Sequence, residues 1–178
     1  SNGRVRFTYL GSLAWQKGVH VLVEAFRDVS PDAARLRIYG DPTVFPEYAE
    51  GLRAAANPAN TSFEGRVPNE EVGRVLAETD VLVVPSLWYE NSPVVIQEAY
   101  AARVPVVASR IGALVGKVGD GEDALLFTPG DSDVLRSVLE VLAADYAKIR
   151  SFQEALPTAT TIAGHVDALS EVYSACCE

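Results

Sequence analysis

Residues 81–100 read VLVVPSLWYENSPVVIQEAY, and this stretch decides the fold. Its first four residues are all apolar, which predicts a short strand that is buried on both faces. Ser92 is a favoured helix N-cap and Pro93 a favoured first helical residue, so a helix is expected over 93–102. A buried strand, a loop and a helix in this order are typical of one unit of a parallel sheet.

The same alternation continues in both directions along the chain. Further strands are predicted at 5–10, 36–39, 61–64, 105–109 and 124–127, and further helices at 19–26, 45–55, 72–76, 135–142 and 162–173, the last capped near Thr160 or Thr161. This pattern predicts an α/β fold, a Rossmann-like parallel sheet with helices on both faces. No linker or internal repeat interrupts it, so residues 1–178 are expected to form a single domain.

The composition excludes several classes of function. A net charge of −9 argues against binding to nucleic acid, which needs a basic surface. The chain has no run of about 18 apolar residues, so no transmembrane segment is predicted. The adjacent Cys176 and Cys177 give no disulfide framework, and a cytoplasmic protein is expected. The absence of methionine predicts that the chain is part of a longer protein.

In parallel sheets covered by helices, ligands bind in the loops at the carboxyl ends of the strands. These loops are predicted at 11–18, 40–46, 65–69, 85–93 and 109–121. The first contains Lys17, which could reach a phosphate above the sheet or could be an ordinary surface lysine. The third contains Arg66, which could contact phosphate, lie beside a base or remain solvated.

The loop at 85–93 indicates a site most strongly. The helix after it presents free N–H groups and the positive end of its dipole, which favour a diphosphate. Glu90 lies before this helix and Glu98 nearly two turns inside it. Because a carboxylate accepts hydrogen bonds from paired hydroxyls, the two acids could bind two sugars on either side of a diphosphate. The simpler interpretation is an ordinary loop acid and an ordinary helix glutamate.

The chain also resembles a known family over nearly its whole length. The matching pieces are YLGSLAWQKGVHVLVEAF, RIYGDP, FEGRVPNEEV, DVLVVPSLWYENSPVVIQEAYAARVPVVAS, GDGEDALLFTPGD and a final helix that ends in EVY. In this order they are similar to the C-terminal, donor-nucleotide lobe of retaining glycosyltransferases of family 4, the group 1 glycosyl transferases, which have the two-lobed GT-B fold. The most specific piece is the E-x7-E signature formed by Glu90 and Glu98, with PS before it and PVVAS after it.

The resemblance implies a role for each nucleotide-binding residue. Lys17 would hold the diphosphate, and Ser12 stands where the family usually has an arginine with the same task. Val67 would offer its backbone to the base, with Arg66 close by. Glu98 would bind the ribose hydroxyls.

The resemblance also implies how the sugar is transferred. Glu90 would contact the hydroxyls of the transferred sugar, so Glu90 and Lys17 are the expected catalytic residues. The phosphates would be held by the backbone at Asn91, Ser92, Pro93 and Val94. The donor would be a nucleoside-diphosphate sugar, such as a UDP-sugar or GDP-sugar, used with retention of configuration and without a metal or other cofactor. A D-x-D sequence at 131–133 lies at the start of a predicted helix, where aspartates act as caps.

The remaining partner would be the N-terminal acceptor lobe of the same protein, which this chain lacks. The isolated chain is therefore expected to be inactive, while the full-length protein would be a hexosyltransferase in polysaccharide or glycoconjugate biosynthesis. Any peripheral contact with a membrane would be made through the missing lobe.

Three departures from the family pattern concern the donor site. Ser12 removes a phosphate-binding cation, Ala113 and Gly116 replace a Gly-Gly pair and a glutamate, and Arg103 stands where the family favours glycine. Arg103 or Lys117 could supply the lost positive charge.

Other interpretations stay open. The lobe could have lost donor binding and serve as a binding or assembly module, or the protein could be another GT-B enzyme such as a nucleotide-sugar epimerase or a phosphorylase. A response-regulator-like domain fits the coarse pattern, but Gly11 and Ser12 stand where such domains carry acidic residues. Trp15 and Trp88 could line the pocket, face the missing lobe or simply pack, and His20 has no evident catalytic partner.

Overall fold

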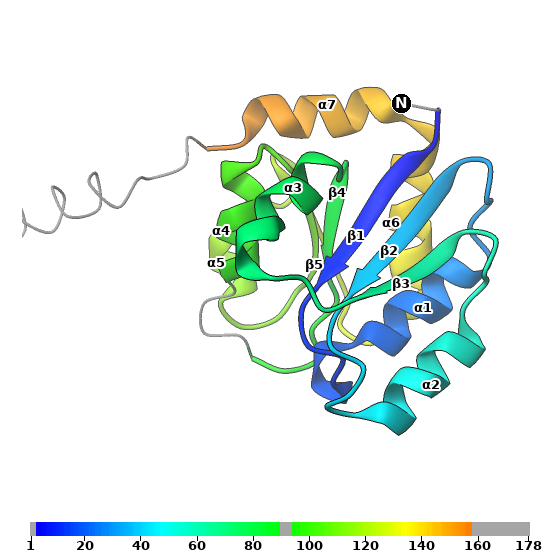
Figure 1. Cartoon of the computed structure of the whole chain (residues 1–178). Coiled ribbons are helices and arrows are strands. Elements are labelled where there is room, and N and C mark those ends of the chain that lie inside the picture. Colours follow the sequence, from blue (N-terminus) through cyan, green and yellow to red (C-terminus); the bar gives the residue numbers. More distant parts are fainter. Residues whose placement is uncertain (1–2, 90–93, 158–178) are drawn as a thin grey trace, which may run out of the picture.

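The computed structural model describes residues 3–89 and 94–157, which form a six-stranded sheet in the order β3-β2-β1-β4-β5-β6. Every pairing between neighbouring strands is parallel. The strands are β1 (Val5–Leu10), β2 (Ala34–Tyr39), β3 (Thr61–Gly65), β4 (Val81–Val84), β5 (Val106–Ser109) and β6 (Ala124–Phe127). The strand order reverses beside β1, which has β2 on one side and β4 on the other (Figure 1). The predicted Rossmann-like parallel sheet is therefore confirmed.

Helices cover both faces of the sheet (Figure 1). They are α1 (Val19–Arg27), α2 (Pro46–Ala55), α3 (Val72–Ala77), α4 (Val94–Ala101), α5 (Leu114–Lys117), α6 (Ser132–Ala144) and α7 (Tyr146–Ala155), with short 3₁₀ turns η1 (Trp15–Lys17) and η2 (Asn69–Glu71). α1, α2 and α6 pack on one face, and α3, α4 and α5 on the other, so the core has one apolar cluster on each side. Over the described residues, no helix has both the length and the apolarity needed to cross a membrane.

β4 shows why a continuous apolar strand is needed at the centre of this sheet. Its four residues are all buried. Val81 and Val83 belong to the cluster under α1 and α6, while Leu82 and Val84 belong to the cluster under α4. Since side chains alternate along a strand, only a strand that is apolar at every position can serve both clusters. The prediction that β4 is buried on both faces is confirmed.

Two helices were missed by the sequence prediction, α5 and α7. α7 follows α6 after a single residue, Asp145, whose side chain accepts hydrogen bonds from Ala147 N at 3.1 Å and Lys148 N at 3.3 Å. Only Ile149 and Phe152 are buried within α7, so its apolar stripe is too short to be evident as a periodic pattern. The helix predicted at 162–173 lies outside the described residues.

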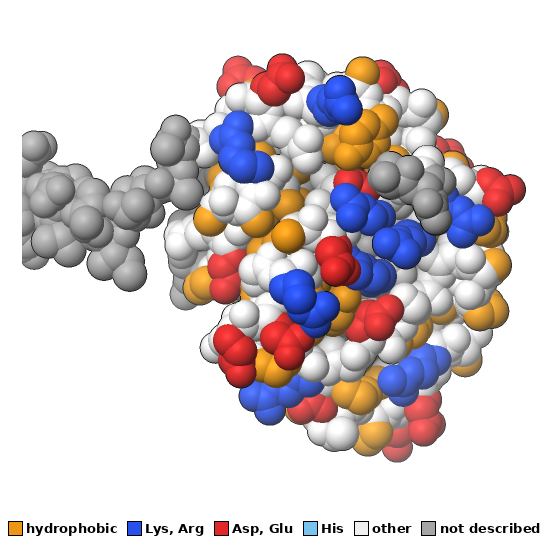
Figure 2. Space-filling view, turned by 45° about the horizontal axis from the view of Figure 1, so that its top comes forward, with side chains coloured by type: hydrophobic (Ala, Val, Ile, Leu, Met, Phe, Trp, Pro, Cys, Tyr) orange, Lys and Arg blue, Asp and Glu red, His pale blue; other side chains and the backbone are white. Residues whose placement is uncertain are grey.

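At the amino edge of the sheet, a buried carboxylate just before β4 forms hydrogen bonds to β1 and α7. Asp80, whose side chain is only 2% exposed, accepts hydrogen bonds from Arg6 at N (2.8 Å), Nε (2.9 Å) and Nη2 (2.7 Å), and from the Tyr146 hydroxyl at 3.1 Å. Burial alone would raise the pKa of Asp80, but the bonds from Arg6 and its charge outweigh it, so the pKa is lowered. On this side of the molecule, Lys and Arg side chains lie among Asp and Glu side chains (Figure 2).

Candidate nucleotide-binding site

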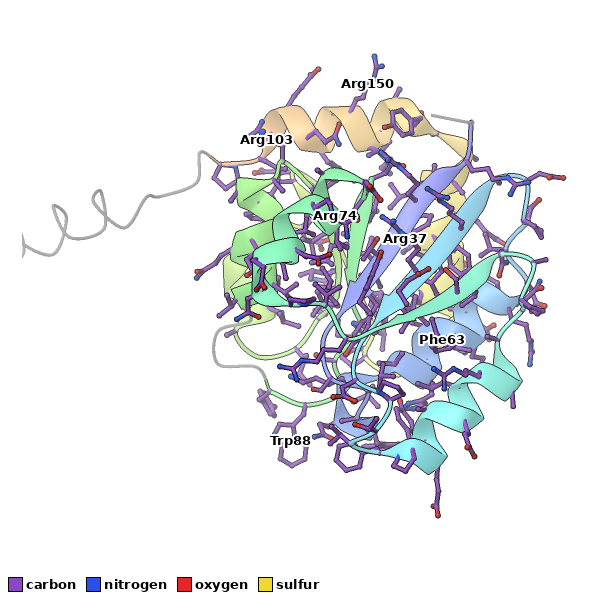
Figure 3. All side chains as sticks on the ribbon, viewed as in Figure 1. Arg37, Phe63, Arg74, Trp88, Arg103 and Arg150 are labelled. Carbon is purple, nitrogen blue, oxygen red and sulfur yellow. The ribbon has the colours of Figure 1, made fainter. Side chains whose placement is uncertain are left out.

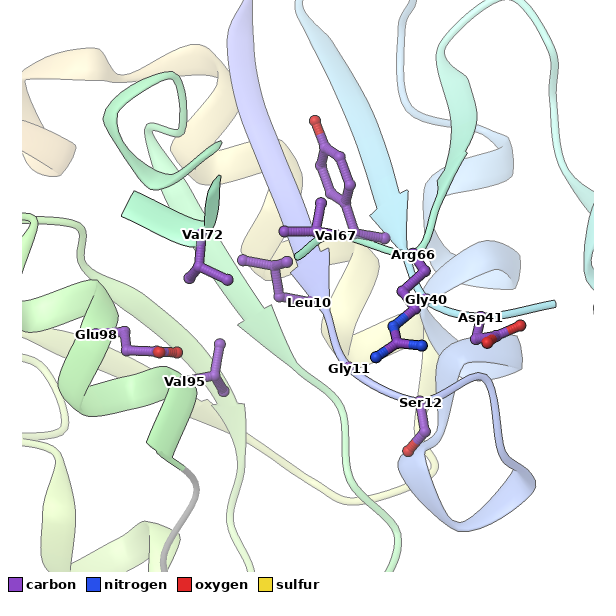
Figure 4. A pocket seen from close by; sticks show the side chains of 11 residues that line it. Leu10, Gly11, Ser12, Gly40, Asp41, Arg66, Val67, Val72, Val95 and Glu98 are labelled. Atoms are coloured by element: carbon purple, nitrogen blue, oxygen red, sulfur yellow. The ribbon is translucent and has the colours of Figure 1, made fainter. Parts of the chain in front are cut away.

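A pocket lies at the carboxyl edge of the sheet, where the strand order reverses. It has a volume of about 410 Å³ and is lined by Leu10, Gly11, Ser12, Tyr39, Gly40, Asp41, Arg66, Val67, Val72, Val95 and Glu98. These residues come from the ends of β1 and β2, from the segment after β3, and from α3 and α4 (Figure 4). In open parallel sheets this crevice is the usual ligand site.

Glycines allow the loops around the pocket to approach one another closely. A Cβ on Gly40 would lie 2.4 Å from Gly11 O, so the loops after β1 and β2 can meet only without a side chain there. Hydrogen bonds join the same loops in series, from Gly11 N to Tyr39 O at 3.1 Å and from Gly40 N to Gly65 O at 2.9 Å. The pocket floor is therefore a connected backbone surface rather than three separate loops.

Four of the predicted site residues line this pocket, namely Ser12, Arg66, Val67 and Glu98. Figure 4 shows Glu98 on α4, one turn after Val95, across the pocket from Arg66, whose side chain extends toward Ser12. Apolar side chains lie between these polar groups. The pocket thus has a carboxylate on one wall and a guanidinium on the other.

A second pocket of about 310 Å³ continues from the first. The two pockets share Leu10, Gly11, Ser12 and Val95, and the second is also lined by Tyr9, Lys17, Val83, Val84, Ser86 and Val94. Lys17 and Val94, two further predicted site residues, are thereby brought next to the first pocket. Val94 begins α4, and the N–H groups of a first helical turn have no acceptor within the helix.

The remaining predicted site residues are Glu90, Asn91, Ser92 and Pro93. They lie outside the described residues, so their roles stay predictions. The described residues on either side of them, Tyr89 and Val94, belong to the same edge of the sheet, since one follows β4 and the other begins α4.

Asp41 is a pocket residue that the sequence prediction did not single out. Its carboxylate accepts hydrogen bonds from Thr43 Oγ1 at 2.6 Å and Thr43 N at 2.8 Å. These two bonds, with a smaller contribution from the charge of Arg66, lower the pKa of Asp41. Its position directly after a strand-end glycine was the only signal available in the sequence, where the loop at 40–46 was marked but not this residue.

The suggestion that Arg103 replaces the positive charge lost at Ser12 is wrong. Arg103 donates hydrogen bonds from Nη1 to Leu156 O at 2.8 Å and from Nη2 to Gln153 O. These carbonyls lie at the end of α7, at the opposite edge from the loop that carries Trp88 (Figure 3). Arg103 follows α4 with φ of 60°, the left-handed conformation in which helices commonly end with glycine. The Lys117 side chain lies outside the described part of the structure.

The D-x-D sequence acts as a helix cap, as predicted. Asp131 is the N-cap of α6 and accepts a hydrogen bond from Val134 N at 2.9 Å, while Asp133 pairs with Arg136. Within residues 3–89 and 94–157, no group of three or more His, Cys, Asp and Glu side chains is arranged to hold a metal ion.

Comparison with known proteins identifies the family. The family model described as "Glycosyl transferases group 1" matches residues 4–145. The chain is 32% identical over 156 residues to a 2-deoxystreptamine glucosyltransferase of Streptomyces kanamyceticus, a match that covers 82% of this chain and 39% of that enzyme.

Solved structures agree with this result. HepE of Anabaena, solved in complex with UDP and glucose, superposes with a TM-score of 0.78 at 23% identity, over 86% of this chain and 42% of HepE. The C-terminal domain of the group 1 family protein LpcC from Francisella tularensis superposes with a TM-score of 0.74 at 21% identity, over 86% of this chain and 82% of that domain. The chain thus spans less than half the length of HepE and of the glucosyltransferase, and it belongs to the group 1 glycosyl transferases, with the fold of a C-terminal GT-B lobe.

Proposed function

We propose that this chain is the donor-binding lobe of a glycosyltransferase that moves a sugar from a nucleoside-diphosphate sugar to an acceptor with retention of configuration. The observation that carries the proposal is the continuous pair of pockets at the sheet's carboxyl edge. They gather Ser12, Arg66, Val67 and Glu98, with Lys17 and Val94 adjoining. The solved complex of HepE with UDP and glucose supports a nucleotide and a sugar as ligands of this fold.

The nucleoside is assigned to the larger pocket. Glu98 presents a carboxylate that can accept hydrogen bonds from both ribose hydroxyls. The base would lie among Leu10, Val67 and Val72, with the Val67 backbone as its hydrogen-bonding group and Arg66 beside it. A pocket with apolar walls and few polar groups suits a flat base, which gains from burial while the polar groups fix its orientation.

The diphosphate is assigned to the smaller pocket. Lys17 supplies a positive charge there, and the first-turn N–H groups of α4 supply donors and the positive end of a helix dipole. Both would act on the negative charge that grows on the leaving diphosphate, without needing a metal ion. Glu90 would bind the hydroxyls of the transferred sugar, and the backbone N–H groups of Asn91 and Ser92 would complete the phosphate site, with Pro93 shaping the backbone there because it has no N–H.

The acceptor would be bound by an N-terminal lobe in a longer protein. Turnover would then require both lobes, so the isolated chain is proposed to bind nucleotide without catalysing transfer. We further propose that the full-length protein works in the cytoplasm, with any membrane contact made by the other lobe.

Isothermal titration calorimetry of the chain with UDP, GDP and ADP, which measures the affinity for each nucleotide, tests the proposal. One nucleotide should bind, and Lys17→Ala and Glu98→Ala should each weaken it, by about tenfold if each removes one charge-assisted contact. Lys148→Ala on α7 and Glu140→Ala on α6 are matched controls away from the pocket and should leave binding unchanged. Binding that both site variants leave unchanged would contradict the assignment.

The second candidate is a lobe that has lost donor binding and serves as a binding or assembly module. Ser12 favours it, because a serine supplies no charge to the phosphates. Nucleotide binding that is weak and indifferent to Glu98→Ala would support this alternative. If the isolated chain binds nothing, the same titration on the full-length protein separates a disabled site from one that needs the other lobe.

A further inference from the structure

Both tryptophans of this chain are exposed at the same edge of the sheet. The chain contains only two, Trp15 and Trp88, and their exposed fractions are 62% and 67%. Tryptophan is on average one of the more buried residue types, and an exposed cluster of large apolar side chains commonly marks a binding surface. Figure 3 shows Trp88 projecting from the loop end of the molecule, away from its core.

The two tryptophans belong to loops that are bonded to each other. Leu87 N, next to Trp88, donates a hydrogen bond of 2.9 Å to Gln16 O, next to Trp15. The same two loops also line the smaller pocket through Lys17 and Ser86. The two tryptophans therefore lie on adjacent loops beside the proposed diphosphate site, and together they are here called the tryptophan rim.

The Trp15 ring is held in place by its neighbours. It stacks on His20, with ring centroids 5.7 Å apart and an interplanar angle of 19°. His20 is fixed in turn by the Tyr48 hydroxyl, which accepts from His20 N at 3.2 Å and lies 2.8 Å from His20 Nδ1. One face of Trp15 is thus braced, while most of the residue remains exposed to solvent.

We infer that the tryptophan rim is a saccharide subsite, which adds to the contacts made by the N-terminal lobe and on which hexopyranose rings of the acceptor stack beside the donor pocket. The C–H face of a pyranose packs well on a flat, rigid aromatic ring, and a braced ring loses little conformational entropy on binding. Gln16 is exposed next to Trp15 in η1, and Lys17 lines the smaller pocket, so both side chains can bond to the hydroxyls at the sugar's edge. The inference rests on the proposed function, because a sugar bound here is an acceptor only if the adjoining pocket binds the donor.

Intrinsic fluorescence tests the subsite directly, since the only two tryptophans of the chain are the proposed ligands. The chain is titrated with maltohexaose into the millimolar range, without nucleotide. We expect a saturating change in emission. Trp15→Ala, followed through Trp88, and Trp88→Ala, followed through Trp15, should each raise the apparent Kd by about fivefold, the effect of losing one stacking contact.

Two further variants distinguish a braced subsite from non-specific contact. Tyr48→Phe removes the hydroxyl that fixes His20, so it should also weaken maltohexaose binding although Tyr48 is not itself a proposed ligand. Val141→Ala, an exposed apolar residue on α6, is the control and should bind as the unmodified chain does. No emission change, or a Kd that neither tryptophan variant alters, would overturn the inference.

A second copy of the chain is the alternative occupant, and the same experiment identifies it. If emission changes on dilution without sugar, and Trp88→Ala abolishes that change, the rim is an interface between copies of the chain and the inference is wrong. Failure of the proposed function is distinguishable: nucleotide would not bind while maltohexaose did. Conversely, nucleotide binding that depends on Glu98, with no response to maltohexaose, would overturn only the saccharide subsite.

Discussion

The carbonyl oxygen of Pro85 lies where a side chain on Gly18 would begin. A Cβ on Gly18 would be 1.9 Å from Pro85 O, and Gly18 has φ of 66°, which side chains disfavour. This close approach brings the loop after β1 against the loop after β4, so that Lys17 and Ser86 line one pocket. A single backbone contact between residues far apart in the sequence thus shapes the proposed diphosphate site.

Gly18→Ala should therefore separate these two loops. We expect a loss of at least about 2 kcal/mol in the free energy of unfolding, from backbone strain and the contact with Pro85, together with weaker nucleotide binding. Denaturant unfolding measures the first effect and calorimetry the second. Gly51→Ala is the control, because its Cβ would meet no atom within 4 Å and it lies inside α2. That variant should be as stable as the unmodified chain or slightly more so; equal losses in both variants would contradict the argument.

Asp80 should give the chain an acid-sensitive contribution to stability. Because its pKa is lower in the folded than in the unfolded state, its contribution is complete above the ordinary aspartate value and is lost as the pH falls through the folded value. Asp80→Asn should cost about 3 kcal/mol at neutral pH, since it leaves Arg6 without its buried partner, and should flatten the acid limb of the stability curve. Denaturant unfolding at several pH values measures both. Asp32→Asn, in the exposed pair with Arg4, should change little at any pH, and a similar acid response in both variants would refute the assignment.

Arg103 should matter for stability and not for nucleotide binding. Arg103→Ala loses the hydrogen bonds to Gln153 O and Leu156 O but keeps the left-handed backbone, whereas Arg103→Gly loses the same bonds and relieves the strain. The alanine variant should therefore be less stable than the glycine variant by about 1 kcal/mol. Thermal or denaturant unfolding of the pair measures the difference. Nucleotide binding that falls in either variant would show that Arg103 acts on the pocket after all.

Asp131 should behave as a helix cap rather than as a metal ligand. Asp131→Ala removes the acceptor of Val134 N and should cost about 1 kcal/mol of stability. Glu140→Ala, on the exposed side of the same helix, should cost much less. Nucleotide affinity should be the same in the presence of EDTA and after Asp131→Ala. A loss of affinity on chelation would contradict the metal-independent site.

Glu98 should determine whether the site discriminates between a nucleotide and its 2′-deoxy analogue. The nucleotide that binds is compared with its 2′-deoxy analogue, in the unmodified chain and in Glu98→Ala. The analogue should bind about fivefold more weakly to the unmodified chain, since one hydroxyl–carboxylate bond is lost at an exposed position. Glu98→Ala should bind both nucleotides equally. If the variant still discriminates between them, another residue contacts the 2′-hydroxyl.

Much of the fold and of the candidate site could be predicted because the signals lie within short contiguous segments. Four adjacent apolar residues at 81–84 predict a strand buried on both faces, and β4 packs into both clusters. The rule that ligands bind at the carboxyl ends of parallel strands then selected the loops containing Ser12, Lys17 and Arg66, all of which line the two pockets. Local pattern and a general topological rule were enough to select these loops, while the binding roles of the three residues stay predictions.

Other features depend on contacts between residues that are distant in the sequence. Nothing near Arg103 reveals that its guanidinium would bind the end of α7, and nothing near Trp15 reveals a stack on His20 braced by Tyr48. α7 itself buries too few residues to be periodic, and it is positioned by the bond from Tyr146 to Asp80. The sequence alone determined the alternation of strands and helices, because hydrophobic periodicity follows from local backbone geometry. Only the tertiary structure decided which side chains meet, because that depends on how the loops and helices pack around the finished sheet.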